Sequence, residues 1–532
     1  MMTPAQKTPS VLSLDAEAAA RWGETLRVSP LPPEGLLLAC DPSLLPDLCA
    51  WLAGERHYRF ATLVTEEREE GWRLRFLFWG REPLWVHLLA EMPRQRTSLP
   101  SISDVVHAAD WHERETEDLF GLTFTGHPRL GDFILHEEWP EGVNPMRWSF
   151  NARVPYTARE VDPQWRPVRI VQAPGAFAMP VGPIFSDTAQ ASHFLLETVG
   201  EDVARTIPRL FYKYRGVEKL AEGEEPAKVL LMAERFTGTS AIAHAWAFCQ
   251  AVERIAGVDI PPRAQLLRAL LAEFERFRHH LAALSDIIHS TGMTVASSQA
   301  DILEEEALRL AGAWAGHRYL YGQVIPGGLA RDWTNGEVQE LAGGVERLAG
   351  GLGRLSRKLR FSGSFLDRLE QVGLVSRTQA EHFGLVGPVA RASGVAEDAR
   401  IDLPYGPYGS LLNPAMAVEE EGDGYARLRV LVAEALTSAR LIREGAERLP
   451  GGPVCLKTPL PSGEALGWCE APRGAAFHWV RLDERGRVAR YRLTTPSFTN
   501  WHGFHLAAER FAFQDFPIIM ATFGLSTAEG DR

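Results

Sequence analysis

Cysteine is scarce in this sequence. Only 5 of the 532 residues are cysteines, and no two of them form a Cys-x-x-Cys pair. Zinc ribbons, iron–sulfur clusters held by a single chain and disulfide frameworks all need sets of cysteines at suitable spacings, so the sequence argues against each of these classes. Disulfides persist mainly in oxidising compartments. We therefore expect an intracellular protein in a reducing compartment.

Long hydrophobic runs and an excess of positive charge are missing as well. No run of roughly 18 apolar residues occurs, so no segment is expected to span a membrane. The N-terminal MMTPAQKTPS lacks the apolar core of a signal peptide. The formal net charge of -12 disfavours nucleic acid as a partner. Any association with a membrane is expected to come through partner subunits, and the length favours two to four domains.

The first 100 residues alternate short apolar runs with turns. Strands are expected over residues 35–40, 58–64, 72–79 and 84–89, the third of them alternating as WRLRFLFW. A short helix is expected over 46–52, with a proline at its first position. Together these elements predict a small α+β domain with an antiparallel sheet.

An acidic motif follows, WHERETEDLFGLTFTGHPRL at 111–130. The residues alone favour a solvated acidic helix that ends at Gly121. The motif also closely resembles the signature of the 30 kDa-type subunit of respiratory complex I and its energy-converting hydrogenase relatives. That resemblance implies a role in folding and in docking onto a large subunit, away from the redox chemistry.

Residues 136–178 are rich in Pro, Arg and Trp and show little periodicity, which predicts an extended linker. We expect two ancestral subunits fused into one chain: an α+β domain of the complex I 30 kDa type over 1–135, the linker, and a second domain over 179–532. Fused forms are known in this family, which supports the boundary.

The second domain contains AERFTGTSAIAHAWAFCQAVE at 233–253, in which a polar loop precedes an apolar helical pattern. From the residues alone this is a core helix with Ser240 at its N-cap. The stretch also resembles the segment of nickel–iron hydrogenase large subunits that carries Arg-x-Cys-Gly-x-Cys, and the matching segment of the 49 kDa-type subunit of complex I. Arg235 and Gly238 match this pattern, whereas Thr237 and Ser240 stand at the cysteine positions.

The metal-binding cysteines of the hydrogenase pattern are missing from the C-terminus as well. Active hydrogenases end with Asp-Pro-Cys-x-x-Cys, and Ser526 and Glu529 stand at those cysteine positions here. Nickel in such centres needs soft, deprotonated thiolates, and a hydroxyl is a poor substitute. The resemblance therefore implies that the chain binds no metal and no cofactor of its own.

Both polar ends of a quinone site are also expected to be absent. The resemblance aligns Phe185 with a quinone-facing histidine of complex I and Gly238 with a quinone-facing tyrosine, and a phenyl ring can neither donate nor accept a hydrogen bond. The candidate residues for a modified cavity share these inherited positions, and they are Phe185, Arg235, Thr237, Gly238, Ser240, Ser526 and Glu529. Arg235 and Glu529 are expected to form its charged pair.

A strongly amphipathic helix is expected over 261–288, with Glu273, Arg276 and His280 at its flank. These three residues match the family pattern. They form either a buried proton relay or a set of satisfied core groups. Further helical patterns at 300–360 and 424–448 predict a helical bundle, and glycines in the first of these patterns would permit close helix approach. Residues 450–495 predict a β-meander.

The fold class expected is thus an α+β N-terminal domain joined to a mainly α-helical, hydrogenase-large-subunit-like domain with small β additions. The resemblance implies a peripheral-arm subunit of a membrane-bound, ion-translocating oxidoreductase complex. Its expected partners are an iron–sulfur small subunit with a 4Fe–4S cluster and antiporter-like and other integral membrane subunits, which would hold it at the cytoplasmic face of the inner membrane. The alternative is a non-redox scaffold subunit of such an assembly.

Overall fold

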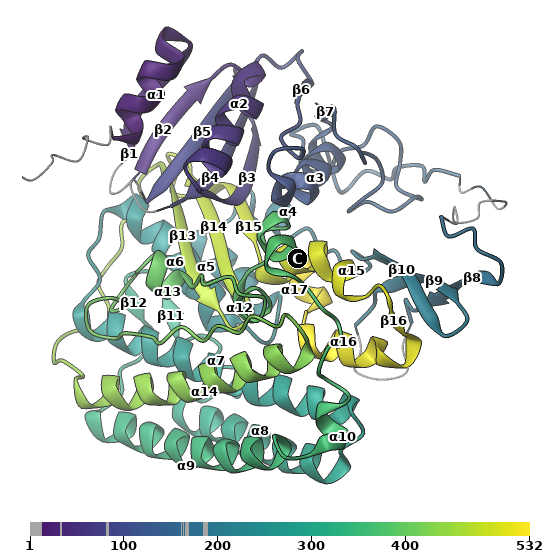
Figure 1. Cartoon of the computed structure of the whole chain (residues 1–532). Helices are drawn as coiled ribbons and strands as arrows, with labels where there is room; N and C mark the ends of the chain where they lie inside the picture. The colour runs from purple at the N-terminus through teal and green to yellow at the C-terminus, as the bar shows by residue number, and fades with distance from the viewer. Residues whose placement is uncertain are drawn as a thin grey trace, which may run out of the picture. The chain divides into compact units, whose positions relative to one another are not determined.

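The structure of the chain is a computed structural model (Figure 1). It describes residues 13–31, 35–80, 84–160, 162, 164, 170–184 and 190–532. The chain divides into two compact units, one of residues 1–133 with 142–154 and the other of residues 134–141 with 155–532.

The first unit is built on a five-stranded sheet with the strand order β1-β2-β5-β4-β3. Its strands are β1 (Leu26–Leu31), β2 (Gly35–Cys40), β3 (Arg59–Glu67), β4 (Trp72–Trp79) and β5 (Trp85–Met92). All four strands expected from the sequence are present. The sheet is mixed, however, because β2 and β5 run parallel, so the expectation of a purely antiparallel sheet is wrong. The chain reaches β5 only after a helix and the β3–β4 hairpin. The accompanying helices are α1 (Leu14–Trp22) and α2 (Leu45–Ala50).

The acidic motif forms α3 (Asp110–Phe120), which ends at Gly121 with a left-handed φ of 70°. The short strands β6 (Ser98–Pro100) and β7 (Thr123–Thr125) pair in parallel beside it.

The expectation that α3 is a solvated acidic helix is wrong. Glu113 is fully buried, and its carboxylate accepts hydrogen bonds from Ser101 Oγ at 2.5 Å and from the backbone N–H of Ile102 at 2.8 Å. Burial raises the pKa of Glu113 to about 7. Glu117 accepts a hydrogen bond from the Gly131 N–H at 2.8 Å. These acids hold neighbouring backbone in place, which is a folding role, and docking stays a prediction.

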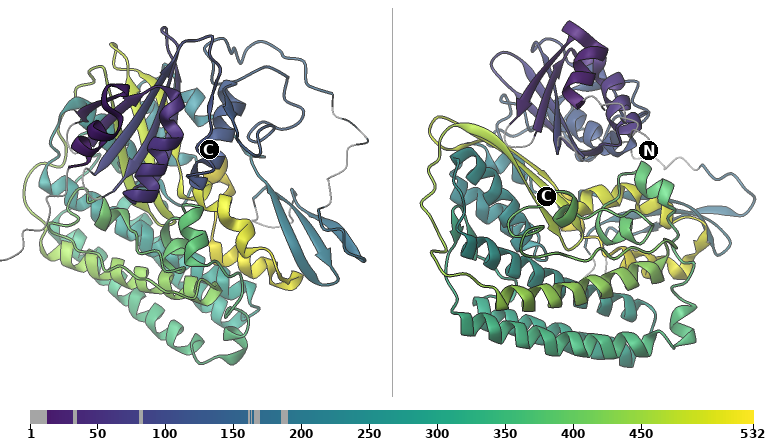
Figure 2. Two further views of the ribbon diagram at one scale, coloured as in Figure 1. Left: turned by 45° about the horizontal axis from the view of Figure 1, so that its top comes forward. Right: turned by 60° about the vertical axis from the view of Figure 1, so that its left-hand side comes forward.

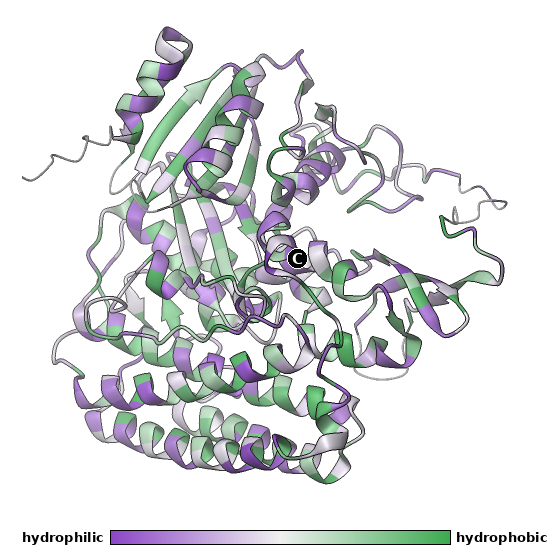
Figure 3. Ribbon diagram, in the orientation of Figure 1, coloured by the Kyte–Doolittle hydropathy of each residue, from purple (hydrophilic) through white to green (hydrophobic). Residues whose placement is uncertain are grey.

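Four long helices form the bundle of the second unit (Figures 1 and 2). They are α7 (Pro262–Ser290), α8 (Thr294–Ala315), α9 (Asn335–Leu359) and α14 (Gly424–Glu447). α7 and α9 each pack against both α8 and α14. Apolar and polar residues alternate along α8 and α9, as Figure 3 shows. A side chain at Gly351 would lie 2.6 Å from Leu303 of α8, so this glycine does permit close helix approach.

A three-stranded antiparallel meander lies beside the bundle, as expected from the sequence, and consists of β13 (Gly463–Ala471), β14 (Gly474–Leu482) and β15 (Val488–Thr494). Helix α6 (Ala241–Ala256) packs against β13 and β14. Gly467 of β13 faces the Ala247 carbonyl of α6 with no room for a Cβ atom. This close packing fixes α6 and the loop before it against the meander.

The remaining elements are short. A second sheet has the order β16-β10-β9-β8, and its strands are β8 (Ala176–Val181), β9 (His193–Val199), β10 (Asp202–Arg209) and β16 (Phe511–Ala512). The other elements are α4 (Val217–Ala221), α5 (Pro226–Arg235), β11 (Val324–Ile325), β12 (Gly328–Leu329), α10 (Gly363–Leu366), α11 (Arg377–His382), α12 (Gly387–Arg391), α13 (Ala399–Asp402), α15 (Pro496–Ala507), α16 (Phe516–Phe523) and α17 (Thr527–Asp531).

Strand β8 begins inside the stretch expected as a linker, and residues 134–141 belong to the second unit whereas 142–154 belong to the first. The boundaries at 135 and 178 stay predictions. None of the helices in the described part of the chain has the length and apolar character needed to cross a membrane.

Candidate functional site

The loop before α6 and the C-terminal segment meet at Arg473, which lies in the turn between β13 and β14. Its Nη1 donates to Thr239 Oγ1 at 2.6 Å, and its Nε donates to the Gly524 carbonyl at 2.6 Å. The same Nη1 lies 3.9 Å from Oε2 of Glu529. The structure thus places the two segments that carry the four inherited cysteine positions against one guanidinium. Sequence reasoning missed Arg473, because nothing in the spacing of the turn marks it.

Glu529 of α17 is the only carboxylate of this group and is fully buried. Its Oε1 lies 3.3 Å from Nε2 of His244, and its Oε2 accepts a hydrogen bond from Ser497 Oγ. Burial raises the pKa of Glu529, but the hydrogen bond from His244 and the charge of Arg473 outweigh it and lower the pKa to about 2. At neutral pH this group is therefore a carboxylate. We call Glu529, His244, Ser497 and Arg473 the Glu529 cluster.

A chain of buried rings extends from this cluster. His244 Nδ1 lies 3.0 Å from Nε2 of His478, and His478 Nδ1 lies 2.8 Å from the hydroxyl of Tyr491. Glu529 can only accept, so a hydrogen sits on Nε2 of His244, and in the neutral form of His244 its Nδ1 accepts from His478. Burial lowers the pKa of His478 well below its ordinary value, so this ring is neutral and accepts from Tyr491. All the hydrogen bonds therefore point in one direction, from Tyr491 to Glu529.

The other hydroxyls at inherited cysteine positions are used in different ways. Ser526 caps α17, since its Oγ accepts from the N–H of Glu529 at 3.1 Å. Thr237 Oγ1 lies 3.3 Å from Thr239 Oγ1. Ser240 is fully buried, and its Oγ finds no hydrogen-bond partner among the residues that the structure describes.

Ser240 occupies the N-cap position of α6, but the expectation that its side chain caps the helix is wrong. The cap comes from Glu275 of α7, whose carboxylate accepts from the backbone N–H groups of Ile242 at 2.9 Å and Ala243 at 3.1 Å. Burial raises the pKa of Glu275 to about 7. A carboxylate from a neighbouring helix takes both early N–H groups and leaves none for the serine.

The expected pairing of Arg235 with Glu529 is also wrong. Arg235 lies in the last turn of α5, where its Nε donates to the adjacent Glu234 at 3.2 Å and its side chain is 51% exposed. Its guanidinium lies over the Tyr321 ring. A side chain at Gly238 would lie 3.6 Å from the Tyr321 hydroxyl. Phe185 lies outside the described residues.

The three residues expected as a proton relay belong to one buried network. Glu273 accepts hydrogen bonds from the hydroxyls of Tyr408 and Ser438, each at 2.6 Å, and lies 3.7 Å from Nε of Arg276. Arg276 Nη1 in turn lies 3.9 Å from Oε2 of Glu434, which pairs with Nε2 of His280 at 3.0 Å. The structure thus brings Glu273, Arg276 and His280 together, with Glu434 as the link that sequence reasoning missed.

This network is a cluster of buried charges that we call the carboxylate–guanidinium cluster. Its members each expose 2% or less, and they are Glu273, Asp398, Glu434, Glu470, Arg276, Arg391 and Arg400. Arg391 bridges Glu434 at 2.8 Å and Glu470 at 3.0 Å, and Arg400 bridges Asp398 at 2.6 Å and Glu273 at 3.0 Å.

The cluster contains four carboxylates and three guanidiniums, and an unpaired buried charge is costly. Burial raises the pKa of Glu434, but Arg391 outweighs it and brings the pKa to about 2. Burial and the neighbouring Asp398 raise the pKa of Glu470 to about 7. The cluster therefore holds one exchangeable proton near neutral pH. The sequence signal that could have found Glu470 is an acid among the apolar residues at the end of strand β13.

Among the described residues, no group of three or more His, Cys, Asp or Glu side chains is arranged to hold a metal ion.

Comparison with known protein families gives three matches. The model of the 49 kDa subunit of respiratory-chain NADH dehydrogenase matches residues 286–460 and 456–532. The model of the 30 kDa subunit of the same enzyme matches residues 38–156, and the model of nickel-dependent hydrogenases matches residues 215–286.

Individual relatives match most of the chain. Formate hydrogenlyase subunit 5 of Escherichia coli is 30% identical over 446 residues, which is 82% of this chain and 78% of the relative. Hydrogenase-4 component G of the same organism is 28% identical over 449 residues, or 83% and 77%. The C/D protein of the NADH-quinone oxidoreductase of Acinetobacter baumannii is 27% identical over 481 residues, or 82% and 80%.

Proposed function

The chain belongs to the family of fused subunits in which a complex I 30 kDa-type part precedes a 49 kDa-type part, and from this premise we propose that it is a peripheral-arm subunit of an ion-translocating oxidoreductase without a nickel–iron centre. Formate hydrogenlyase subunit 5 and the C/D protein of NADH-quinone oxidoreductase belong to the same family. In this proposal an iron–sulfur partner subunit with a 4Fe–4S cluster delivers electrons. The chain couples their transfer to antiporter-like and other membrane subunits, which hold it at the cytoplasmic face of the inner membrane.

The observation that carries the proposal is the state of Glu529. A nickel–iron centre needs deprotonated sulfur at four positions, and these positions hold two serines, one threonine and one glutamate. Glu529 already accepts hydrogen bonds within the chain from His244 and Ser497 and faces Arg473. The donor set does not fit the metal centre, and the position is filled by internal hydrogen bonds instead.

The carboxylate–guanidinium cluster supports a coupling role for this chain. A group that titrates near neutral pH changes its proton occupancy when a charge nearby appears or disappears. Glu470 has a pKa of about 7, so reduction of a neighbouring partner cluster would raise its proton occupancy. In the proposal, electron arrival and proton uptake are linked in this way by electrostatics rather than by chemistry at a metal.

The proposal is tested on the intact complex purified from membranes. Metal analysis is expected to find iron from the partner and far less than one nickel per chain, and stoichiometric nickel would overturn the proposal. Vesicles that carry the complex are then supplied with reduced viologen, and ion movement is followed with a fluorescent dye. We expect wild-type vesicles to build a gradient and Glu470→Gln vesicles, with the complex fully assembled, to build it on the order of 10²-fold more slowly.

A non-redox scaffold is the second candidate, and one observation favours it. The side chains of Glu529, Ser526 and Thr237 are all hydrogen-bonded within the chain, as in a core region without a ligand. If wild-type and Glu470→Gln vesicles build equal gradients, or if neither builds one, the scaffold replaces the coupling role.

A further inference from the structure

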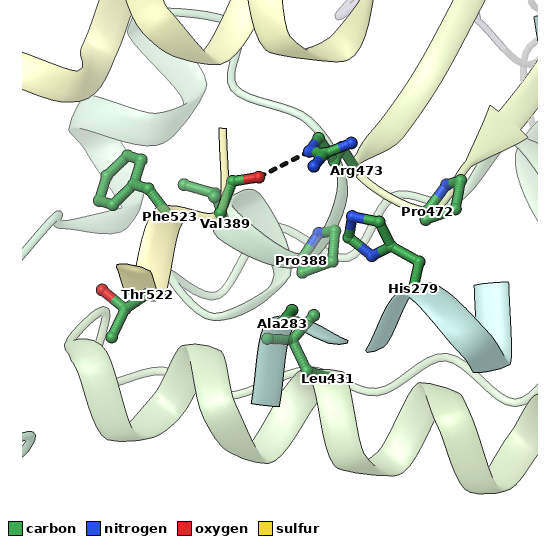
Figure 4. A pocket seen from close by; sticks show the side chains of 10 residues that line it. His279, Ala283, Pro388, Val389, Leu431, Pro472, Arg473, Thr522 and Phe523 are labelled. Carbon is green, nitrogen blue, oxygen red and sulfur yellow. Dashed lines mark hydrogen bonds between the residues drawn. The ribbon is translucent and has the colours of Figure 1, made fainter. Parts of the chain in front are cut away.

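A small cavity lies between the Glu529 cluster and the carboxylate–guanidinium cluster. Its lining comes from α7, α12, α14, the β13–β14 turn and the end of α16, and it includes His279, Ala283, Leu431, Arg473 and Phe523. The volume open to the centre of a water molecule is about 10 Å³, which is room for about one water. Figure 4 shows the His279 imidazole beside the Arg473 guanidinium, with the hydrogen bond from Arg473 to the Gly524 carbonyl drawn dashed.

At this cavity, Nε2 of His279 can accept a hydrogen bond that no described residue donates. His280 Nε2 donates to the carboxylate of Glu434 at 3.0 Å, so Nδ1 of the neutral His280 must accept. It lies 3.3 Å from Nδ1 of His279, which therefore carries the hydrogen. His279 Nε2 is then an acceptor, and it makes no hydrogen bond to any residue that the structure describes, although His279 is only 6% exposed.

Arg473 supplies the complementary group. Its Nε and Nη1 are used, whereas Nη2 makes no hydrogen bond within the described part of the chain. A guest in the cavity must therefore accept from a guanidinium and donate to the imidazole of His279. A water molecule does both, whereas an anion such as chloride cannot donate.

We propose that this cavity holds one water and that the water, His279 and His280 form a proton path into the carboxylate–guanidinium cluster. A proton that arrives on the water passes to Nε2 of His279. The Nδ1 proton of His279 passes to Nδ1 of His280, and the Nε2 proton of His280 passes to Oε2 of Glu434. Glu434 becomes a carboxylic acid only in passing and gives the proton to the carboxylate of Glu470, which shares the Arg391 guanidinium with it. The water is left as water, and both imidazoles remain neutral in their opposite tautomers.

The surroundings favour this neutral exchange over a charged imidazole. Burial lowers the pKa of His279 well below its ordinary value, and the nearby guanidiniums of Arg473, Arg278 and Arg276, together with His280, act in the same direction. A tautomer exchange moves a proton without placing a positive ring among these charges. The receiving cluster has four carboxylates for three guanidiniums, so it can accept one proton without an excess of positive charge.

The proton path rests on the proposed function, because it supplies the proton that the carboxylate–guanidinium cluster takes up there. Its test needs no electron transfer, so the proton path and the proposed function can fail separately. The purified full chain is taken by rapid mixing from pH 8.5 to 5.5, and the infrared band of a protonated buried carboxyl is followed in time. Glu113 and Glu275 contribute to this band as well, so the component that is lost in Glu470→Gln is the one assigned to the cluster. In His279→Gln, whose side chain cannot exchange tautomers, we expect the band to rise on the order of 10²-fold more slowly with unchanged amplitude.

Two further variants complete the test. Ala283→Val leaves both histidines in place but fills the water site, and we expect a similarly slow rise. His289→Gln changes an exposed histidine near the end of the same helix, and it should match the wild type. Equal rates in the wild type, His279→Gln and Ala283→Val would overturn the proposal, and so would a band of unchanged amplitude in Glu470→Gln.

Discussion

The Glu529 cluster and the carboxylate–guanidinium cluster are both buried in the second unit, and they differ in their balance of charge. The first has one carboxylate and one guanidinium, and its remaining members, His244 and Ser497, donate hydrogen bonds to the carboxylate. The second has four carboxylates and three guanidiniums. The pKa of Glu529 is accordingly lowered to about 2, whereas one member of the larger cluster, Glu470, has a pKa raised to about 7.

This difference shows what each cluster can do. A balanced site keeps one protonation state across the physiological range, so it can fix a charge and orient a hydrogen-bond chain. An unbalanced site exchanges a proton near neutral pH, so it can respond to charges around it. The Glu529 cluster therefore keeps a fixed charge, and the carboxylate–guanidinium cluster is the one that responds to charges around it.

The largest effect is expected from Arg400→Met in the carboxylate–guanidinium cluster. The change leaves Asp398 and Glu273 buried without their shared guanidinium, and breaking such a pair costs about 3–5 kcal/mol. Urea denaturation at pH 7 measures the loss. Arg309→Met, which removes an exposed pair with Glu305, is the control and should leave the unfolding midpoint nearly unchanged. An Arg400→Met protein as stable as the control would show that the cluster is not paired as described.

Glu529→Gln tests the balanced cluster. The folded pKa of about 2 lies below the ordinary 4.5, so the carboxylate contributes stability above pH 4.5 that is lost as the pH falls toward 2. The variant should lose about 3 kcal/mol at pH 7 and show a flatter acid limb.

Glu305→Gln is the matched control for this variant, because the pKa of Glu305 is also lowered to about 2 although the side chain is exposed. Solvent screening should make its effect at pH 7 small. If Glu529→Gln and Glu305→Gln lose the same free energy of unfolding at pH 7, the burial of Glu529 does not strengthen its contribution to stability.

Glu470→Gln tests the unbalanced cluster, and the pH dependence has the opposite sign. The folded pKa of about 7 lies above the ordinary 4.5, so the folded state binds more protons in this window and loses stability as the pH rises through it. The wild type should lose up to about 3 kcal/mol between pH 4.5 and 7 from this group, and Glu470→Gln should not. If the stability curves of the two proteins are parallel across this range, Glu470 is not the group that exchanges the proton.

Local patterns in the sequence predict much of the fold. The ranges expected for β2 and β4 are those observed, and α7 differs from its expected range by one residue at its start and two at its end. These predictions succeed because a helix or strand that buries one face has apolar residues repeating with its own period in the sequence. The parallel pairing of β2 with β5 leaves no such trace, because it depends on a hairpin inserted between them. The pattern over 300–360 likewise contains the end of α8 and all of α9, and a capping box at Thr334 marks the start of the second helix.

The candidate site could be predicted only in part for a related reason. The inherited positions Ser526 and Glu529 are visible as replacements within a motif. Their partners are not, since Arg473 reaches them from a distant turn and His244 is one polar residue in an apolar helix. The motif positions alone therefore predict a pair of Arg235 with Glu529, whereas Arg235 forms its ion pair with the adjacent Glu234.

The smallest effect is expected at the far end of the ring chain, in Tyr491→Phe. The change removes the donor to Nδ1 of His478 and leaves a buried acceptor without a partner, which costs about 1–2 kcal/mol. Histidine-selective ¹⁵N spectra should also change, because Nδ1 of His478 loses the hydrogen bond that it accepts from the Tyr491 hydroxyl. Tyr319→Phe, at a partly exposed ring, should affect neither measurement. An unchanged His478 spectrum in Tyr491→Phe would show that Tyr491 donates no hydrogen bond to His478, and the chain of buried rings would then end at His478.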